Sequence, residues 1–169
     1  MPPADIQIRA LEAADFDDVA EIFAQPRAVW GTLQAPYLSV EARRARHLAL
    51  PPGHTAIGAV VDGKVIGAAG LHPEANRRRA HVASIGMAVH DGFAGRGAGR
   101  ALLGALLELA DRWQNFSRIE LTVWADNDRA IRLYEGAGFV REGLHRAYAF
   151  RDGAYVDAIA MARLREGLA

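Results

Sequence analysis

The sequence predicts one mixed α/β domain that spans residues 1–169, with helices flanking a central sheet. The length is that of a single domain of ordinary size, because domains commonly hold about 100–200 residues. Apolar residues make up 51% of the chain and charged residues 24%, proportions typical of a folded protein with one core. Segments with the alternation of strands are interspersed with segments of helical spacing, in the expected order β-α-α-β-β-β-α-β-α-β-β.

The N-terminal third is expected to hold a strand and two helices. Apolar residues alternate with polar ones at 6–8, as in a short strand, and Asp15 is placed to cap the helix that follows. The segment 25–38 contains two prolines among apolar residues, so it is predicted to be an irregular loop. Ser39 opens a second helix, rich in arginine, which ends before residues 51–53.

Three strands are expected next. The runs 55–61 and 64–71 flank Asp62-Gly63, a dipeptide that favours the type I′ turn of a tight hairpin. A further strand runs from about residue 80 to 89, after a loop at 76–79. These segments therefore supply the middle of the predicted sheet.

The C-terminal part alternates helices and strands. Apolar residues at helical spacing predict an amphipathic helix at 99–113, and regular alternation predicts a strand at 119–123. Asn127 then starts a helix that stops at the glycines of 136–138. The last segment, 139–164, is predicted to be a hairpin with an Arg-Asp-Gly turn.

Charge and cysteine content exclude several classes of protein. Twenty basic and twenty acidic residues cancel, so the chain lacks the strong positive charge of a general nucleic-acid or membrane-surface binder. The absence of cysteine rules out disulfides, thiolate zinc sites and a cysteine nucleophile. The six histidines show no tight metal-ligand spacing, and no metal is predicted.

The N-terminus offers no sign of export. Residues 1–5 lack a basic start followed by an apolar run, and no stretch approaches the roughly 20 apolar residues that span a bilayer. A cytoplasmic protein is therefore expected.

A glycine-rich segment joins the strand that ends at Val89 to the long helix, with four glycines in eight residues. Glycines let backbone amides approach a phosphate, and the positive end of the helix dipole favours a pyrophosphate. Arg96 and Arg100 can add bidentate contacts to phosphate oxygens. The segment lacks the Lys-Ser/Thr of a Walker loop and the third glycine of a dinucleotide fingerprint, which argues against nucleotide hydrolysis and hydride transfer.

Two motifs resemble those of the GNAT superfamily of N-acyltransferases. Residues 94–99 match its pyrophosphate loop, Gln/Arg-x-x-Gly-x-Gly/Ala, at both glycines, and depart from it at Ala94. Further along, the sequence matches the family signature Asn-x-x-Ala-x-x-x-Tyr-x-x-x-Gly-Phe. The matching positions are Asn127, Ala130, Tyr134, Gly138 and Phe139.

The resemblance to the family covers nearly the whole chain. In three segments the sequence resembles one subgroup of the family in particular. Residues 32–36, 119–123 and 148–157 resemble bacterial members that acetylate free L-amino acids. The implied fold is a mixed, mostly antiparallel sheet with a splayed strand pair, flanked by helices. Other members of the family act on antibiotics, on phosphinothricin or on protein N-termini, and many form dimers, so a homodimer is implied as well.

The resemblance implies acetyl-CoA as cofactor, which supplies the thiol that the chain lacks. Its pantetheine arm would pair with the strand at 87–89 like an extra strand, next to a bulge at 85–88, and its pyrophosphate would lie on the glycine loop. The implied cofactor contacts are Met87, Ala88, Val89, Gly95, Arg96, Gly97, Ala98, Gly99, Arg100, Asn127, Ala130 and Tyr134. As the first residue of a helix, Asn127 can also act as a cap.

The implied chemistry needs an acid and a base. Tyr134 matches the family's general acid, and a phenol of pKa about 10 can protonate a departing thiolate of pKa about 8.5. Many members place a carboxylate where this sequence has Ser84. Since serine is no general base, the expected substitute is a water held by Ser84 and assisted by His81 or Glu120.

Several side chains are candidates for the acceptor pocket, because aromatic rings give apolar area and polar groups orient a substrate. They are Trp30, Leu33, Gln34, Tyr148 and Tyr155. The leading expectation is acetyl transfer to the primary amine of a small molecule, with a free L-amino acid favoured. The alternative within the same class is an acetyltransferase for protein N-termini, antibiotics or phosphinothricin. The alternative of another class is a non-catalytic acyl-CoA sensor, which Ala94 and Ser84 leave open and Tyr134 argues against.

Overall fold

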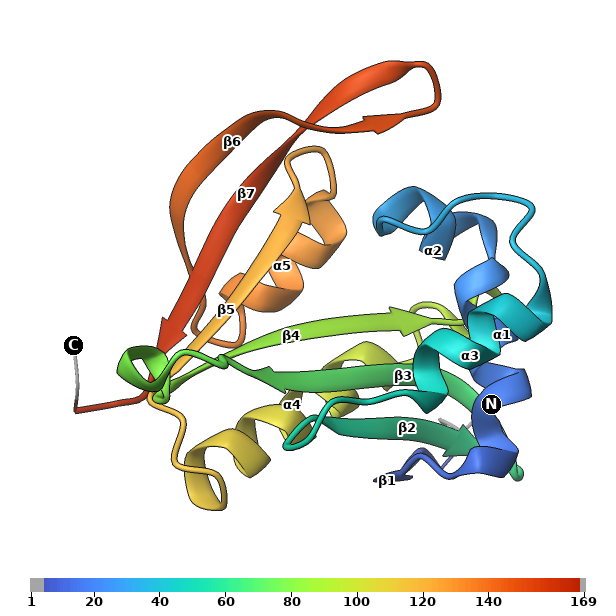
Figure 1. Ribbon diagram of the computed structural model, residues 1–169, viewed down its shortest axis with the longest axis horizontal. Helices are drawn as coiled ribbons and strands as arrows, with labels where there is room; N and C mark the ends of the chain where they lie inside the picture. Colours follow the sequence, from blue (N-terminus) through green and yellow to red (C-terminus); the bar gives the residue numbers. More distant parts are fainter. Residues whose placement is uncertain (1–4, 168–169) are drawn as a thin grey trace. The chain divides into compact units, whose positions relative to one another are not determined.

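The seven strands follow the order β1-β2-β3-β4-β5-β7-β6 across one sheet. The pairs β1–β2, β2–β3, β5–β7 and β6–β7 are antiparallel, and β4–β5 is parallel. The expected mixed, mostly antiparallel sheet is therefore confirmed. The computed structural model, shown in Figure 1, describes residues 5–167. Residues 1–4, which carry most of the expectation about targeting, lie outside the described residues.

The chain forms two compact units. The first holds residues up to His72 together with Gly86–Leu107, and the second holds Pro73–Ile85 together with residues from Glu108 onward. The division falls within β3, β4 and α4, so each of these elements has residues in both units. The single-domain expectation stays a prediction.

The first unit combines three antiparallel strands with three short helices and the start of a long one (Figure 1). Its elements are β1 Gln7–Ala10, α1 Phe16–Ala24, α2 Pro26–Gly31, α3 Val40–Leu48, β2 Thr55–Val61, β3 Lys64–Pro73, the second half of β4 Val82–Val89, and most of α4 Ala98–Arg112. Its core cluster is Phe16, Val19, Ile22, Ala28, Val60, Val65, Ala68 and Ala88. The apolar face of α1 thus packs on β2 and β3, as its spacing predicts.

The hairpin of β2 and β3 confirms the expected turn. Asp62 and Gly63 have φ values of 50° and 81°, and a type I′ turn requires this left-handed conformation at both central residues. Ser39 also acts as expected, because its hydroxyl accepts from the backbone N–H of Ala42 at 3.1 Å and caps α3.

Two expectations in the first unit are wrong. The segment predicted as a loop contains α2, which begins at Pro26; proline fits the first helical position because its missing N–H would have had no partner there. Asp15 occupies the N-cap position of α1, but its side chain does not cap that helix. The Asp15 carboxylate instead binds the Arg9 guanidinium at 2.6 and 2.8 Å, and this contact lowers the pKa of Asp15.

The second unit is built on β5, β6 and β7 (Figure 1). Its elements are the first half of β4, the end of α4, β5 Arg118–Trp124, α5 Asp128–Glu135, β6 Val140–Arg151 and β7 Ala154–Leu164. The segment predicted as a loop at 76–79 contains a short 3-10 helix, Arg77–Arg79, capped by Asn76. The Asp111 carboxylate at the end of α4 binds Arg163 of β7 at 3.0 and 2.8 Å.

The second unit also confirms the C-terminal hairpin. Residues 152 and 153 form its turn with φ values of 48° and 81°, the same type I′ geometry as the first hairpin. Strand β6 is the last strand of the sheet and is exposed along most of its length. It thus has an edge that no other strand of the described chain covers.

Candidate active site

The glycine loop has the backbone geometry of an anion cradle. Gly95 and Gly97 have φ values of +82° and +94°, in the left-handed region that other residues rarely adopt. A Cβ atom at either position would meet nothing within 4 Å, so space is open beside the loop. Helix α4 begins directly after it, with its first bond running from Ala101 N–H to Gly97 O at 3.0 Å. The first N–H groups of the helix have no partner within it and can bind an anion.

Both arginines of the loop lie on the surface of the first unit. Arg96 is exposed and its guanidinium lies over the ring of Phe93, 5.2 Å from the ring centre. Arg100 is exposed on the first turn of α4. These positions suit the phosphate contacts expected of them, and guanidinium groups bind phosphate in a bidentate manner.

The strand before the loop offers backbone groups to an extended ligand. His90 N–H donates to Ile66 O of β3 at 2.8 Å, and Ala88 O lies on the side of Gly67 of β3. Because backbone groups alternate along a strand, those of Met87 and Val89 face away from β3. The register of β4 with β5 covers only the first three residues, 82–84. Met87 and Val89 therefore suit the pantetheine pairing expected of them, whereas Ala88 is turned toward β3.

His90 anchors the start of the glycine loop, and nothing in the sequence marks this histidine as a functional residue. His90 Nδ1 accepts from Gly92 N–H at 3.1 Å, so Nε2 carries the proton and donates to Glu21 Oε1 at 3.1 Å. Glu21 also binds Lys64 at 2.9 Å. The pKa of Glu21 is lowered by Lys64 first and by His90 second. Helix α1 is thereby tied to the entrance of the glycine loop.

The expected general acid, Tyr134, lies on α5 in the second unit. Its side chain is buried and packs against the ring of Phe139, 5.7 Å away. Burial raises the pKa of Tyr134 to about 12, so the phenol stays protonated and can act as a donor. Gly138 has a φ of +90°, which turns the chain after α5 so that Phe139 can reach the tyrosine. In this chain the last two residues of the signature thus place an aromatic ring against the tyrosine.

Asn127 caps the same helix. Its Oδ1 accepts from the N–H of Ala130, the next signature residue, at 3.2 Å. The cap uses only the side-chain oxygen, so the amide N–H groups are still able to donate to a ligand. Both of the functions expected of Asn127 are compatible with this geometry.

The base candidates gather where β4 and β5 pair. Ser84 is exposed and lies in register with Glu120, so their side chains share one face of the sheet. Glu120 accepts from Arg118 Nε at 2.6 Å and from Arg79 at 2.8 Å. Both carboxylate oxygens thus already hold a guanidinium. The Arg118 pKa is raised by Glu142 first and by Glu120 second, so this arginine stays charged.

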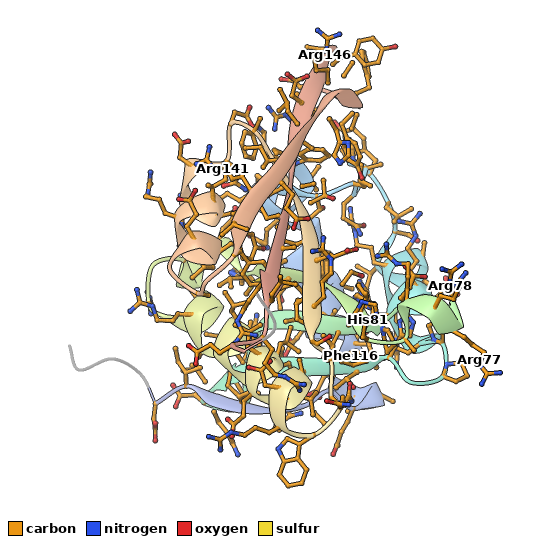
Figure 2. The ribbon with its side chains drawn as sticks, turned by 90° about the vertical axis from the view of Figure 1, so that its left-hand side faces the viewer. Arg77, Arg78, His81, Phe116, Arg141 and Arg146 are labelled. Carbon is orange, nitrogen blue, oxygen red and sulfur yellow. The ribbon has the colours of Figure 1, made fainter. Side chains whose placement is uncertain are left out.

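His81 is exposed at the start of β4, and its carbonyl accepts from Ser117 N–H at 3.0 Å. Figure 2 shows it beside Phe116, at the point where β5 begins. Arg77 and Arg78 lie at the outer surface of the unit in the same view. The structure therefore places Ser84 opposite Glu120, each the third residue of its strand, and His81 directly before β4. Glu120 is held by two ion pairs, whereas His81 has none within residues 5–167.

The acceptor candidates fall into two groups. In the first unit, Trp30 and Leu33 are exposed at the end of α2 and after it, and Gln34 is half-buried. In the second unit, Tyr148 lies 5.9 Å from Trp124 between ring centres, and Tyr155 lies 5.3 Å from Phe150.

Tyr155 also lines a depression of about 390 Å³ with acidic groups on its wall. The other lining residues are Ala125, Asp126, Val156 and Asp157. Residues 5–167 contain no group of three or more His, Asp or Glu side chains that could hold a metal ion. In the same range, no helix is long and apolar enough to cross a membrane.

The fold and the two signatures define an acetyltransferase. Residues 16–139 match the family described as the Acetyltransferase (GNAT) family, and the chain belongs to this family. It is accordingly an acyltransferase that takes its acetyl group from acetyl-CoA. Among curated proteins, the chain is 40% identical over 162 residues to the L-amino acid N-acetyltransferase AaaT of Escherichia coli K12, covering 96% of this chain and 99% of that protein.

Other relatives extend the comparison. The N-alpha-acetyltransferase RimI of Mycobacterium tuberculosis is 36% identical over 118 residues, 70% of each chain. A GCN5-related N-acetyltransferase from Kribbella flavida superposes with a TM-score of 0.83 at 30% identity, over 98% of this chain and 100% of that one. A phosphinothricin acetyltransferase from Sinorhizobium meliloti, solved in complex with AcCoA, has a TM-score of 0.83 at 25% identity, over 96% and 90%.

Proposed function

We propose that the protein acetylates the primary amine of a free L-amino acid. The observation that carries this acceptor is the 40% identity, over 96% of the chain, to a named L-amino acid N-acetyltransferase. The identity to RimI covers a smaller part of the chain, which makes protein N-terminal acetylation the second candidate. Membership of the family and the buried tyrosine acid support an enzyme rather than a non-catalytic sensor.

The donor would be held mainly by backbone atoms of this chain. Acetyl-CoA, when bound, supplies an activated acetyl thioester. The N–H groups of the loop at 95–100 and of the first turn of α4 would bind its pyrophosphate, with Arg96 and Arg100 adding charge. Met87 and Val89 would hydrogen-bond the extended arm and orient the thioester carbonyl. Asn127 and Ala130 are proposed to contact the same arm from the start of α5.

The acid and the base act on opposite sides of the transfer. Tyr134 would donate its phenolic proton to the leaving thiolate, since burial keeps the phenol protonated. Before attack, the acceptor ammonium must lose a proton to become a nucleophile. We assign this to a water held by Ser84, with His81 as the group that takes the proton onward, because Glu120 already holds two guanidinium groups.

The assignment of the base predicts different outcomes for two variants. His81→Gln should lower kcat about tenfold to a hundredfold near neutral pH, because general-base catalysis contributes roughly that factor or more. Glu120→Gln should lower kcat by less than about threefold while it lowers the melting temperature, because the Arg79 and Arg118 contacts are weakened. Steady-state kinetics and thermal unfolding of both variants test this. A larger kcat loss in Glu120→Gln than in His81→Gln would reverse the assignment.

A screen of acceptors tests the proposed reaction itself. Wild-type protein is incubated with acetyl-CoA and each of the L-amino acids, a set of polyamines, phosphinothricin and short peptides with free N-termini, and the released thiol is read. Turnover is expected with one or more free amino acids at a higher kcat/KM than with any peptide. A preference for peptides would instead establish the N-terminal acetyltransferase.

The remaining expectations concern assembly and location. Leu144 is an exposed apolar residue of β6, the edge strand beside β7, and an uncovered edge can pair with the same strand of a second copy about a two-fold axis near Leu144. A homodimer through β6 is proposed on this basis. The chain is also proposed to act as a single domain. Its proposed location is the cytoplasm, where acetyl-CoA is available.

Sedimentation velocity tests the dimer. Leu144→Lys places two like charges at the proposed axis and should shift the species from dimer to monomer. Leu164→Lys, on β7 and also exposed, is the matched control and should leave the sedimentation coefficient unchanged. A monomeric wild-type protein at micromolar concentration would contradict the proposed assembly.

A further inference from the structure

A buried arginine in the first unit has no carboxylate partner within residues 5–167. Arg43 of α3 is 3% exposed and is the only charged side chain fully buried among the described residues. Its Nη1 donates to Phe23 O at 2.8 Å and to Gln34 Oε1 at 3.2 Å, and its Nη2 donates to Ala35 O at 3.0 Å. All three acceptors are neutral.

Such a charge is costly to bury, because a cation taken from water needs compensation from its surroundings. Phe23 is near the C-terminal end of α1, where the helix dipole and the free carbonyls give partial compensation. The Nε atom of Arg43 is buried without a hydrogen-bond partner. An apolar residue in place of Arg43 would avoid this cost. The buried guanidinium therefore indicates a function of Arg43 beyond packing.

The contacts of Arg43 fall on the segment that is predicted to bind the acceptor. Within this segment, Gln34 N–H donates to Thr32 Oγ1 at 3.2 Å, and the Thr32 hydroxyl donates to Ala28 O at 2.6 Å. Arg43 adds one bond to the Gln34 side chain and one to the next carbonyl. The backbone around Gln34 is thus fixed from both ends.

The contact also determines which way the Gln34 amide faces. A guanidinium has donors and no acceptor, so only the oxygen of the amide can face Arg43, and the NH₂ group must face the other way. Within residues 5–167 the structure gives that NH₂ group no hydrogen-bond partner. Two oriented N–H donors therefore stand on the predicted acceptor segment.

We propose that Arg43 is a positioning residue that orients the Gln34 amide so that its N–H groups donate to the α-carboxylate of the acceptor. This inference rests on the proposed function, since it assigns the recognition of the carboxylate that distinguishes an amino acid from a simple amine. Gln34 is then a specificity-determining residue, and Arg43 acts through it.

The test compares each amino acid that the wild type acetylates with the amine formed by its decarboxylation. Gln34→Met keeps the length of the side chain and removes both donors, and Arg43→Lys keeps the charge and removes the forked contact. Each variant should raise KM for the amino acid about tenfold to a hundredfold, as expected for lost hydrogen bonds to a charged group, while KM for acetyl-CoA and for the decarboxylated amine stays within about twofold. Arg46→Met, an exposed arginine on the same helix, is the matched control and should leave all constants unchanged.

The outcomes separate this inference from the proposed function. Equal losses toward the amino acid and its decarboxylated amine in Gln34→Met would overturn the carboxylate contact, even in an enzyme that acetylates amino acids. A wild-type protein that turns over no amino acid would overturn the proposed function. The acceptor screen of the wild type gives this result before any variant is made. If Arg43→Lys unfolds at a lower temperature, Gln34→Met still decides the carboxylate contact, because it leaves the buried arginine in place. An Arg43→Lys enzyme with an unchanged KM for the amino acid would overturn the positioning role of Arg43.

Discussion

Replacing Tyr134 by phenylalanine is expected to lower kcat about a hundredfold to a thousandfold, in line with the usual size of general acid catalysis. The substitution removes one hydroxyl from a buried ring that packs on Phe139, so the packing of the ring is retained. KM for acetyl-CoA should stay within about threefold, because the hydroxyl acts on the leaving group and not on the pyrophosphate. Steady-state kinetics at saturating amine measure both constants.

The pH dependence gives a second check on the same residue. Burial raises the pKa of Tyr134 to about 12, so the phenol is protonated throughout the neutral range and loses its proton only as the pH approaches that value. No alkaline fall of kcat below about pH 11 is therefore expected from this group. Tyr37→Phe is the control, since Tyr37 is fully exposed, and it should leave kcat unchanged. A Tyr134→Phe enzyme with wild-type kcat would remove Tyr134 as the acid.

Replacing Gly97 by valine is expected to weaken acetyl-CoA binding by about tenfold to a hundredfold. A residue with a branched side chain is strained at a φ of +94°, by roughly 1–3 kcal/mol, so the loop should adopt another conformation and lose its converging N–H groups. A Cβ atom at residue 97 would meet nothing within 4 Å, so no clash within the protein is expected. The expected loss of affinity therefore comes from the strained backbone and from the side chain filling space that the ligand needs. Calorimetric titration with CoA measures the dissociation constant.

A second glycine of the same helix serves as its control. Gly104 lies in the middle of α4 with ordinary helical φ and open space around its Cα. Gly104→Ala should leave the affinity for CoA unchanged and raise the stability of the protein by up to about 1 kcal/mol. Unchanged affinity in Gly97→Val would show that the pyrophosphate does not lie on this loop.

Local signals in the sequence predicted most of the fold correctly. Asp62-Gly63 specifies its turn through the φ values that it adopts, and Ser39 and Asn127 specify helix starts through bonds to residues three positions away. These interactions lie within a few residues, so the sequence alone contains them. The two prolines of residues 25–38 predict a loop, but helix α2 begins at Pro26 because proline suits the first position of a helix.

Interactions between distant residues account for what the sequence did not show. His90 and Glu21 are 69 positions apart, and Arg43 reaches Phe23 across 20 positions, so neither contact leaves a pattern along the chain. Arg79 likewise binds Glu120 across 41 positions, whereas the second partner of Glu120, Arg118, lies only two residues away on the same strand. The cofactor contacts that the motifs imply stay a prediction, and the contacts that support the loop and the strands could be found only from the folded chain.

Because β4 pairs with β5 only over residues 82–84, the backbone of Met87 and Val89 is left available to a ligand. This use of main-chain groups has a consequence for how such an enzyme can change its substrate. The loop N–H groups and the backbone of Met87 and Val89 belong to the main chain, which every substitution other than proline preserves. The proposed recognition of the donor would therefore tolerate most substitutions at these positions, apart from those of the glycines and of Arg96 and Arg100. The acceptor, by contrast, is expected to be recognised by side chains such as Gln34. A lineage built this way can exchange one acceptor for another by a few substitutions while its donor chemistry stays constant.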